Sequence, residues 1–325
     1  GRNGNDHTMR IAILDDYQNL ALQAADWSGV TAHGEITVFN DTIIHPDALR
    51  DRLMPFDVLC VMRERTPISG ELIRALPNLK LIVTTGKRND AIDVATANQL
   101  GITVCGTESP STATPELTFA LMLGLARNIV DENASMRGGG WQIGVGQDLA
   151  GSTLGIVGLG RLGAKIAKIA QAFEMRVTAW SANLTRERCE ELGVEYMDSK
   201  ETLLRDADFV TIHQRLSDRT RGLIGSAEFA QMKKTAFLIN TSRGPIVDDV
   251  ALIDAVNKGE IAGAGIDVYD REPLPPSHPL RKCERLLLTP HLGYVTRHTW
   301  EVFYGQTVEA VLAWINGKPI RVISD

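Results

Sequence analysis

A run of glycines between an apolar segment and a helical segment constrains the fold of this chain most. The sequence TLGIVGLGRLGAKIAKIAQAF contains Gly158, Gly160 and Gly163. In such a unit the first glycine allows a tight turn, the second lets a pyrophosphate approach the backbone, and the third lets helix and strand pack closely. The backbone N–H groups of Arg161 and Leu162 would face the phosphates at the start of the helix. This order of strand, glycines and helix predicts a dinucleotide-binding site.

Short apolar runs alternate with helical patterns along most of the chain. They fall into two series, residues 10–14, 37–39, 57–62, 79–85 and 102–105, and residues 153–157, 176–180, 209–213, 236–240, 263–268 and 286–289. Continuous apolar runs are typical of parallel strands that helices cover on both faces. We therefore expect an α/β protein with two doubly wound parallel sheets. Further helices are expected at 46–53, 69–76, 115–130 and 296–316. The last is expected to be amphipathic, with an aliphatic stripe of Val302, Val308, Val311, Leu312 and Ile315 on one side.

The composition excludes several classes of protein. A length of 325 residues suggests about two domains. The 34 Lys and Arg against 40 Asp and Glu give a net charge of −6, which argues against a nucleic-acid partner. The apolar run 117–126 is too short to cross a membrane. The four cysteines lie far apart and lack zinc-type spacing, so we expect reduced thiols, no metal and a cytoplasmic location. Residues 1–8 are expected to be a remnant of expression.

The position that selects the coenzyme departs from the NAD pattern. NAD-type sites place Asp or Glu about 20 residues after the glycines, where it binds the ribose hydroxyls. The corresponding strand here ends in VTAWSANLTRER, with Ser181 at that position. No carboxylate would repel a 2′-phosphate, and Ser181, Asn183, Thr185 or Arg186 could bind one. We therefore expect NADPH rather than NADH, with a solvated loop as the alternative.

Three later segments carry polar residues at the ends of expected strands. They are INTSRG at 239–244, GIDVYDREP at 265–273 and LTPHLG at 288–293. Ligands of open α/β sheets bind outside the carboxyl ends of the strands, where these segments would lie. Hydride transfer to a 2-oxo acid needs a cation for the carboxylate and carbonyl, a proton donor for the developing alkoxide, and a group that keeps this donor protonated.

The three segments contain side chains of the required types. Arg243 can grip a carboxylate through two parallel hydrogen bonds, and histidines such as His291 exchange protons near neutral pH. A nearby carboxylate would stabilise the protonated histidine, and Glu272, Asp267 and Asp270 all compete for that role. The spacing alone does not choose among the three acids. A surface ion pair for the arginine and a structural role for the histidine are the alternatives.

Together these motifs resemble those of the D-isomer-specific 2-hydroxyacid dehydrogenases, from residue 10 to residue 322. The resemblance rests on GLGRLG at 158–163, INTSRGPIVDDVAL at 239–252, GIDVYDREPLP at 265–275 and TPHLGY at 289–294. It implies that Arg243 binds the substrate, that His291 is the acid/base and that Glu272 is its partner. It also implies that Thr241 and Asp267 lie near the nicotinamide, and that the backbone around His213 runs along the cofactor.

The resemblance further implies the domain organisation. A Rossmann NAD(P)-binding domain at 107–291 would be inserted into a flavodoxin-like substrate domain formed by residues 9–106 and 292–325. The segment 137–151 would extend onto a second subunit, so we expect a homodimer. In relatives the turn after the strand at 79–85 binds the substrate carboxylate. Here that turn contains Lys87 and Arg88, which could favour a substrate with a second anionic group or could simply be solvated.

The resemblance implies an NAD(P)-dependent oxidoreductase that interconverts a 2-oxo acid and a D-2-hydroxy acid, similar to a glyoxylate/hydroxypyruvate reductase. A phosphoglycerate-type dehydrogenase is one alternative. A non-enzymatic binding protein that senses the dinucleotide, similar to the co-repressors of this fold, is another. Absorbance at 340 nm with a panel of 2-oxo acids would separate the enzyme from the binding protein.

Overall fold

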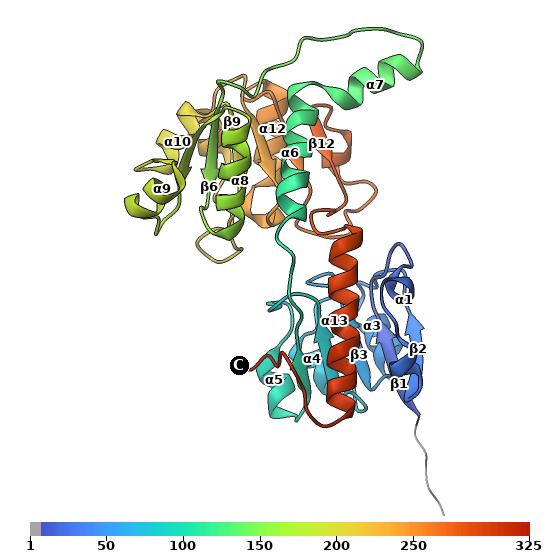
Figure 1. The fold of residues 1–325 in the computed structure, drawn as a ribbon. Helices are drawn as coiled ribbons and strands as arrows, with labels where there is room; N and C mark the ends of the chain where they lie inside the picture. Colours follow the sequence, from blue (N-terminus) through green and yellow to red (C-terminus); the bar gives the residue numbers. More distant parts are fainter. Residues whose placement is uncertain (1–7) are drawn as a thin grey trace, which may run out of the picture. The chain divides into compact units, whose positions relative to one another are not determined.

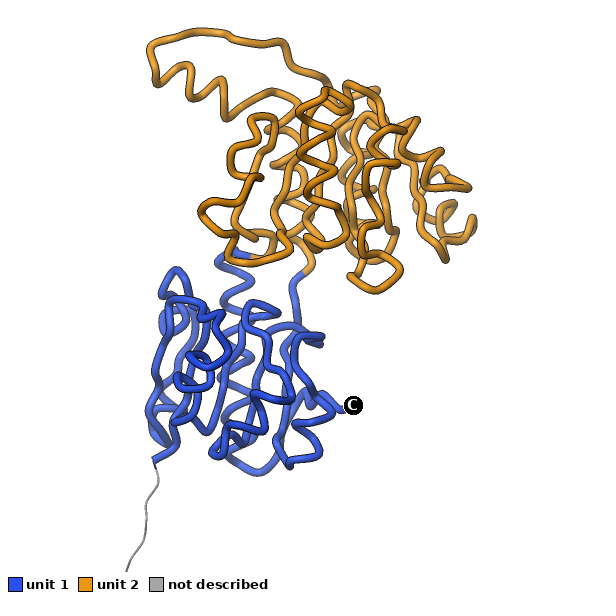
Figure 2. Tube along the Cα trace, turned by 180° about the vertical axis from the view of Figure 1, so that it is seen from behind, with its two compact units in different colours: residues 1–110, 295–325 blue, residues 111–294 orange. Residues whose placement is uncertain are grey.

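The computed structural model describes residues 8–325 (Figure 1). The expected expression remnant at 1–8 therefore lies outside the described residues, except for Thr8. The chain forms two compact units, which are coloured separately in Figure 2. Unit 1 contains the described residues up to Pro110 together with Val295–Asp325, and unit 2 contains Ser111–Tyr294.

Unit 1 is a five-stranded parallel sheet with helices on both faces. The strand order is β2-β1-β3-β4-β5. The strands are β1 (Met9–Ile13), β2 (Gly34–Val38), β3 (Val58–Val61), β4 (Leu81–Thr84) and β5 (Thr103–Cys105). The helices are α1 (Ala21–Ala24), α2 (Ser28–Thr31), α3 (Pro46–Leu53), α4 (Gly70–Arg74), α5 (Val94–Gln99) and α13 (Arg297–Ile315). The order reverses between β1 and β3, as in doubly wound folds of the flavodoxin type.

Unit 2 is a seven-stranded parallel sheet of order β12-β11-β10-β9-β6-β7-β8. Its strands are β6 (Thr153–Val157), β7 (Arg176–Trp180), β8 (Glu195–Tyr196), β9 (Phe209–Ile212), β10 (Phe237–Asn240), β11 (Gly263–Ile266) and β12 (Leu286–Leu288). Its helices are α6 (Ala113–Ala126), α7 (Ile129–Arg137), α8 (Arg161–Ala172), α9 (Arg186–Leu192), α10 (Lys200–Asp206), α11 (Ser226–Gln231), α12 (Asp249–Lys258), and the 3-10 turns Gly244–Ile246 and Pro279–Lys282. The order reverses between β6 and β9, so this edge is where a dinucleotide would bind.

The predicted fold class is confirmed, because both sheets are entirely parallel and doubly wound. The continuous apolar runs are the buried strands. All residues of β3 and β6 are buried, as expected when helices cover both faces. Strand β8 was not predicted, because it has only two residues and contains no apolar run.

Two expectations about helices were wrong in detail. The single helix expected at 115–130 is two helices, α6 and α7, because Asn128 between them adopts a left-handed conformation with φ +52°. Asparagine tolerates this conformation better than most residues. On α13 we expected an aliphatic stripe, but the buried side also includes the aromatic rings of Trp300, Phe303 and Tyr304. Leu312 and Ile315 of the expected stripe are only partly buried.

Three further observations on the described residues concern the cysteines, membrane-spanning helices and metal-binding clusters. All four cysteines are free and buried, and burial raises the pKa of the Cys60 thiol to about 12. Among residues 8–325, no helix combines the length and the apolar character that a membrane span needs. The same residues contain no group of three or more His, Cys, Asp or Glu side chains arranged to hold a metal ion.

Candidate active site

The glycine segment forms the turn between β6 and α8. Gly158 has φ +100°, and a Cβ at this position would collide with the carbonyl oxygen of His213. A Cβ on Gly163 would collide with the carbonyl oxygen of Gly158, so only glycine lets α8 pack this closely on β6. In contrast, a Cβ on Gly160 would meet no atom of the described chain within 4 Å. The open space in front of the second glycine fits a dinucleotide pyrophosphate.

The first turn of α8 is also suited to an anion. The helix begins at Arg161, and no described side chain caps it through a hydrogen bond to its N-terminal N–H groups. The first N–H groups of a helix have no partner inside the helix and carry a partial positive charge. Arg161 and Leu162 therefore present these groups beside the glycine turn, as expected for a phosphate-binding helix start.

His213 follows β9 and lies next to the glycine turn. Its N–H donates to the carbonyl oxygen of Val157 over 2.8 Å, and its ring Nε2 lies 2.8 Å from Thr211 Oγ1. Burial lowers the pKa of the His213 ring to about 4, so the ring is neutral at neutral pH. The ring therefore carries no charge, and the backbone of His213 lies directly against the glycine turn.

The four residues considered for a 2′-phosphate differ in their surroundings. Thr185 Oγ1 accepts a backbone hydrogen bond as the N-cap of α9. Arg186 lies 2.9 Å from Asp198 and stacks on the ring of Tyr196. Ser181 follows β7 directly and is half-buried, and Asn183 is exposed. Ser181 and Asn183 thus have fewer of the described side-chain contacts than Thr185 and Arg186.

Arg243 lies after β10 on a loop that several hydrogen bonds hold in place. Asn240 Nδ2 donates to the carbonyl oxygen of Arg243 over 3.0 Å, and the N–H of Ser242 donates to Asn240 Oδ1 over 3.0 Å. Ser242 Oγ also donates to the carbonyl oxygen of Ile212 at the end of β9 over 2.6 Å. The half-buried guanidinium donates from Nη1 to Ser242 O over 2.7 Å. The neighbouring Thr241 is buried.

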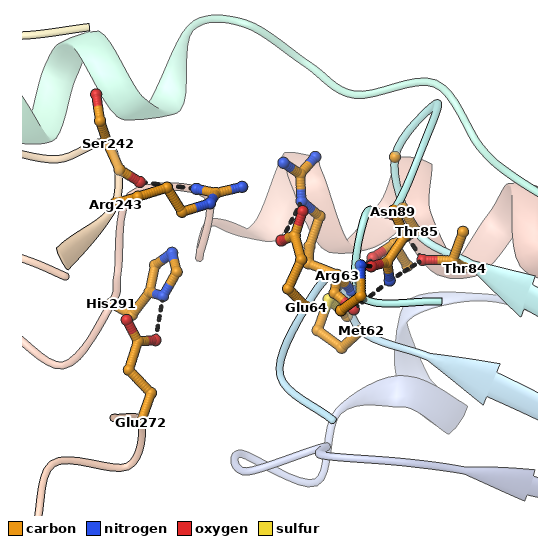
Figure 3. Close-up of polar contacts among 12 residues, drawn as sticks. Met62, Arg63, Glu64, Thr84, Thr85, Asn89, Ser242, Arg243, Glu272 and His291 are labelled. Carbon is orange, nitrogen blue, oxygen red and sulfur yellow. Dashed lines mark hydrogen bonds and ion pairs between the residues drawn. The ribbon is translucent and has the colours of Figure 1, made fainter. Parts of the chain in front are cut away.

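His291 and Glu272 form a hydrogen-bonded pair. Nδ1 of His291 bonds to Oε1 of Glu272, and the N–H of Tyr269 donates to Oε2 over 3.0 Å. Burial alone would raise the pKa of Glu272, but the hydrogen bond and charge of His291, the Tyr269 N–H and the charge of Arg243 together lower it. Figure 3 shows the imidazole between Glu272 and Arg243. Of the three acids that the sequence left open, the structure therefore pairs Glu272 with the histidine.

Asp267 anchors the loop that carries His291. Its buried carboxylate accepts hydrogen bonds from Thr289 Oγ1 over 2.7 Å, from the N–H of Leu292 over 2.7 Å and from the N–H of Gly293 over 2.9 Å. Burial raises the pKa of Asp267, and these bonds and the His291 charge oppose that rise. His291 itself has φ +52°, an uncommon conformation for a residue other than glycine. Asp267 thus bonds to the backbone on the C-terminal side of this residue.

Lys87 and Arg88 lie on the turn after β4 in unit 1, and their side chains are not buried as those of a preformed binding site usually are. Both residues are exposed, and Arg88 Nε lies 4.0 Å from a carboxylate oxygen of Asp90. Their assignment to the substrate stays a prediction. Sequence reasoning missed Arg63, which follows β3 and packs over Gly86. The signal that identified Arg243, an arginine after a buried parallel strand, was also present there in the sequence VMRERT.

The comparisons with known proteins decide the family. The family model for the "D-isomer specific 2-hydroxyacid dehydrogenase, NAD binding domain" matches residues 119–293. This chain belongs to the D-isomer-specific 2-hydroxyacid dehydrogenases. It is therefore an NAD-dependent 2-hydroxyacid dehydrogenase, and the predictions of an enzyme and of a nicotinamide cofactor are confirmed. Family membership favours this assignment over the alternative of a binding protein without activity.

The names glyoxylate reductase and D-3-phosphoglycerate dehydrogenase both recur among relatives of this dehydrogenase. A glyoxylate reductase from Aeropyrum pernix is 41% identical over 261 residues, which cover 77% of this chain and 78% of that protein. A D-3-phosphoglycerate dehydrogenase from Archaeoglobus fulgidus is 38% identical over 265 residues, which cover 80% of this chain but only 50% of that protein. A solved phosphoglycerate oxidoreductase from Vibrio cholerae has a TM-score of 0.90 and 36% identity, and covers 95% of this chain and 99% of its own.

Proposed function

We propose that this dehydrogenase interconverts a small 2-oxo acid and its D-2-hydroxy acid, as glyoxylate and hydroxypyruvate reductases do. The observation that carries the proposal is the His291–Glu272 pair beside Arg243, on loops that follow parallel strands of unit 2. Relatives named glyoxylate reductase at 41% and 38% identity support this class of substrate.

His291, Glu272 and Arg243 each have a role in the reduction of the 2-oxo acid. When bound, the reduced nicotinamide supplies a hydride to the carbonyl carbon. Because Nδ1 of His291 is bonded to Glu272, Nε2 remains to donate a proton to the carbonyl oxygen. The Glu272 carboxylate stabilises the protonated ring and holds its orientation. Arg243 binds the substrate carboxylate and polarises the carbonyl oxygen. The oxidation follows the same steps in reverse.

The residues that would hold the cofactor are those of the glycine turn, the N–H groups of Arg161 and Leu162, and the backbone at His213. Thr241 and Asp267 would lie toward the nicotinamide. We propose NADPH as the preferred coenzyme, because residues 181–184 are Ser, Ala, Asn and Leu and contain no carboxylate to repel a 2′-phosphate.

The test of the proposal is a set of initial rates at 340 nm, with NADH and NADPH, on glyoxylate, hydroxypyruvate, pyruvate and bulkier 2-oxo acids. We expect turnover with at least one small 2-oxo acid and a higher kcat/KM with NADPH. An NADH preference of about tenfold, or about 1.4 kcal/mol, would overturn the coenzyme assignment. The absence of any change in absorbance at 340 nm with every 2-oxo acid would overturn the proposed reaction.

A phosphoglycerate-type substrate is the second candidate. The name of the full-length structural relative from Vibrio cholerae favours it, and so does the presence of cationic side chains after strands of unit 1. Adding 3-phosphohydroxypyruvate to the panel separates the two candidates. A kcat/KM for this compound about tenfold or more above that for glyoxylate would favour the second candidate.

We also propose a homodimer formed through α7 and the following segment 138–148. Every residue of α7 is at least partly exposed. Six large apolar side chains on this part of the chain are more than half exposed, namely Ile129, Val130, Met136, Trp141, Ile143 and Val145. A hollow of about 390 Å³ lies beside them, lined in part by Val130, Val145 and Leu287. Such concentrations of exposed apolar surface mark sites of protein association.

A double substitution, Trp141→Asp with Val145→Asp, is expected to separate the subunits, because two charges would have to be buried in the interface. Size-exclusion chromatography with light scattering measures the mass, against 35.5 kDa for one chain. Leu100→Asp is the matched control, since Leu100 is also exposed but lies in unit 1. A wild-type protein that elutes as a single chain would contradict the proposal.

A further inference from the structure

Tyr269 lies where the segments of unit 2 that carry the candidate site meet. It is the third residue after β11, and only 7% of its surface is exposed. Its N–H donates to Oε2 of Glu272 over 3.0 Å, while Oε1 of the same carboxylate bonds to His291. The backbone of Tyr269 thus fixes one oxygen of the carboxylate. The reaction steps proposed above give no role to its phenol side chain.

The hydroxyl of Tyr269 joins the ends of two adjacent strands. Its Oη lies 2.8 Å from the carbonyl oxygen of Thr289, the first residue after β12, and 3.0 Å from that of Ile266, the last residue of β11. A hydroxyl has one proton, so the two carbonyl oxygens share this donor. Burial raises the pKa of the Tyr269 hydroxyl, and so do the charges of Asp267 and Glu272. The hydroxyl therefore stays protonated in the neutral range and remains a donor.

The carbonyl of Thr289 connects this hydroxyl to the histidine. The same oxygen accepts the N–H of His291 over 3.1 Å. His291 has φ +52°, and such a conformation persists only where surrounding contacts enforce it. Asp267 accepts the N–H groups that follow His291, and the Tyr269 hydroxyl bonds to the carbonyl that precedes it. One tyrosine thus bonds to the carboxylate through its N–H and to the histidine loop through its hydroxyl.

The segment of Arg243 also packs against the backbone of Tyr269. A Cβ on Gly244, the next residue, would lie 2.1 Å from the carbonyl carbon of Tyr269 and 2.5 Å from the nitrogen of Asp270. Only glycine therefore allows the two segments to come this close. This contact limits movement of the Tyr269 backbone, so the hydroxyl is held from a fixed base.

We propose that Tyr269 is a positioning residue, whose hydroxyl fixes the His291 loop so that Nδ1 of the imidazole meets the Glu272 carboxylate. Tyr269 does not touch the substrate and acts only through His291 and Glu272. Every contact in this argument lies within unit 2. The inference rests on the proposed function, because the pair that it positions is the acid/base pair of that reaction.

Tyr269→Phe removes the hydroxyl and keeps the ring. Both carbonyl oxygens would retain a backbone donor, because the oxygen of Ile266 also accepts the N–H of Thr289 over 3.0 Å and the oxygen of Thr289 accepts that of His291. Neither oxygen would become an unsatisfied buried group, so the variant should fold. Tyr304→Phe is the matched control. Tyr304 is a buried tyrosine of unit 1, and its hydroxyl has no hydrogen-bond partner among residues 8–325.

The first measurement is steady-state kinetics at 340 nm with the 2-oxo acid that the wild type reduces fastest. We expect kcat to fall about tenfold or more in Tyr269→Phe, because a misplaced proton donor transfers less efficiently, with KM nearly unchanged. Combining Tyr269→Phe with Glu272→Gln should lower kcat little beyond Glu272→Gln alone, since the hydroxyl acts through that carboxylate. Tyr304→Phe should keep the kcat of the wild type.

Three kinetic outcomes would overturn the inference. They are an unchanged kcat in Tyr269→Phe, a loss confined to KM, and fully additive losses in the double variant with Glu272→Gln. Additive losses would show that the hydroxyl supports the fold and not the histidine–carboxylate pair.

Proton NMR observes the same contact without turnover. The Nδ1 proton of an imidazole that is bonded to a carboxylate resonates far downfield of backbone amides, and its loss in His291→Ala assigns it. We expect this resonance to move upfield or to broaden in Tyr269→Phe and to stay in place in Tyr304→Phe. A resonance that Tyr269→Phe leaves unchanged would reject the inference. Inactivity of the wild type on every 2-oxo acid would instead reject the proposed function, so the two failures are distinguishable.

Discussion

Replacement of His291 by alanine is expected to lower kcat for reduction of 2-oxo acids by about 100- to 10,000-fold, the usual contribution of a positioned acid/base residue. The developing alkoxide would lose its proton donor, while the glycine turn that faces the pyrophosphate would be intact. The dissociation constant for the coenzyme, measured by fluorescence titration, should therefore change little. His298→Ala is the matched control, because His298 is an exposed histidine at the start of α13. Unchanged turnover in His291→Ala would reject the assignment.

Substitution of Glu272, the hydrogen-bond partner of His291, is expected to change the pH dependence of the reaction. The pKa of Glu272 is held below its ordinary value, so its carboxylate is ionised throughout the neutral range. Glu272→Gln retains a hydrogen-bonding side chain but removes the negative charge that stabilises the protonated imidazole. We expect the alkaline limb of the pH–rate profile for reduction to move to lower pH in Glu272→Gln, and an unmoved limb would contradict the pairing.

Substitution of Arg243 by lysine is expected to lower kcat/KM for the 2-oxo acid by about 100-fold, equivalent to about 2.7 kcal/mol. An ammonium group cannot form the two parallel hydrogen bonds of the guanidinium with a carboxylate. Arg243→Ala should lose more, because the charge disappears as well. Steady-state kinetics measures both losses, and coenzyme affinity should persist. Added guanidinium salt should restore part of the activity of Arg243→Ala, since the loop that Asn240 and Ser242 hold would remain in place.

Arg219→Lys is the control for the Arg243 variants, because Arg219 is an exposed arginine of unit 2. It should leave both KM and kcat unchanged. A fall in coenzyme affinity equal to the fall in kcat/KM would show that Arg243 supports the cofactor site and not the substrate. Equal activities of Arg243→Lys and the wild type would show that no bidentate contact is made in the transition state.

Much of the fold was predictable because its signals are local. The strands β6 and β7 and the helix α3 begin and end at the predicted residues. Each is a short apolar run or helical pattern bounded by residues that break it. The glycine motif was predictable for the same reason, since the turn, the open space at Gly160 and the packing of Gly163 against Gly158 are formed by neighbours in sequence. The carbonyl oxygen of His213, which excludes a side chain at Gly158, comes from a distant segment. The break at Asn128 and the two-residue strand β8 carry too little local signal for such a reading.

The candidate site depended on contacts between segments far apart in the chain. Spacing could not choose between Glu272 and Asp267, because both follow β11 within a few residues. The tertiary structure separates them, since Glu272 bonds to the His291 ring and Asp267 bonds to the backbone beyond that residue. The backbone of Arg63 likewise depends on a distant residue, since its carbonyl oxygen accepts a hydrogen bond from Asn89 on the turn after the next strand.

The sequence by itself thus determined two parallel doubly wound sheets, a dinucleotide-binding turn and the segments that carry the arginine, the acids and the histidine. These features follow from the periodicity of apolar residues and from glycines at a strand–helix junction. Only the tertiary structure decided which carboxylate pairs with His291. A hydrogen bond depends on the positions of its two groups in space. Glu272 and His291 are 19 residues apart in the sequence and meet only after the sheet has formed.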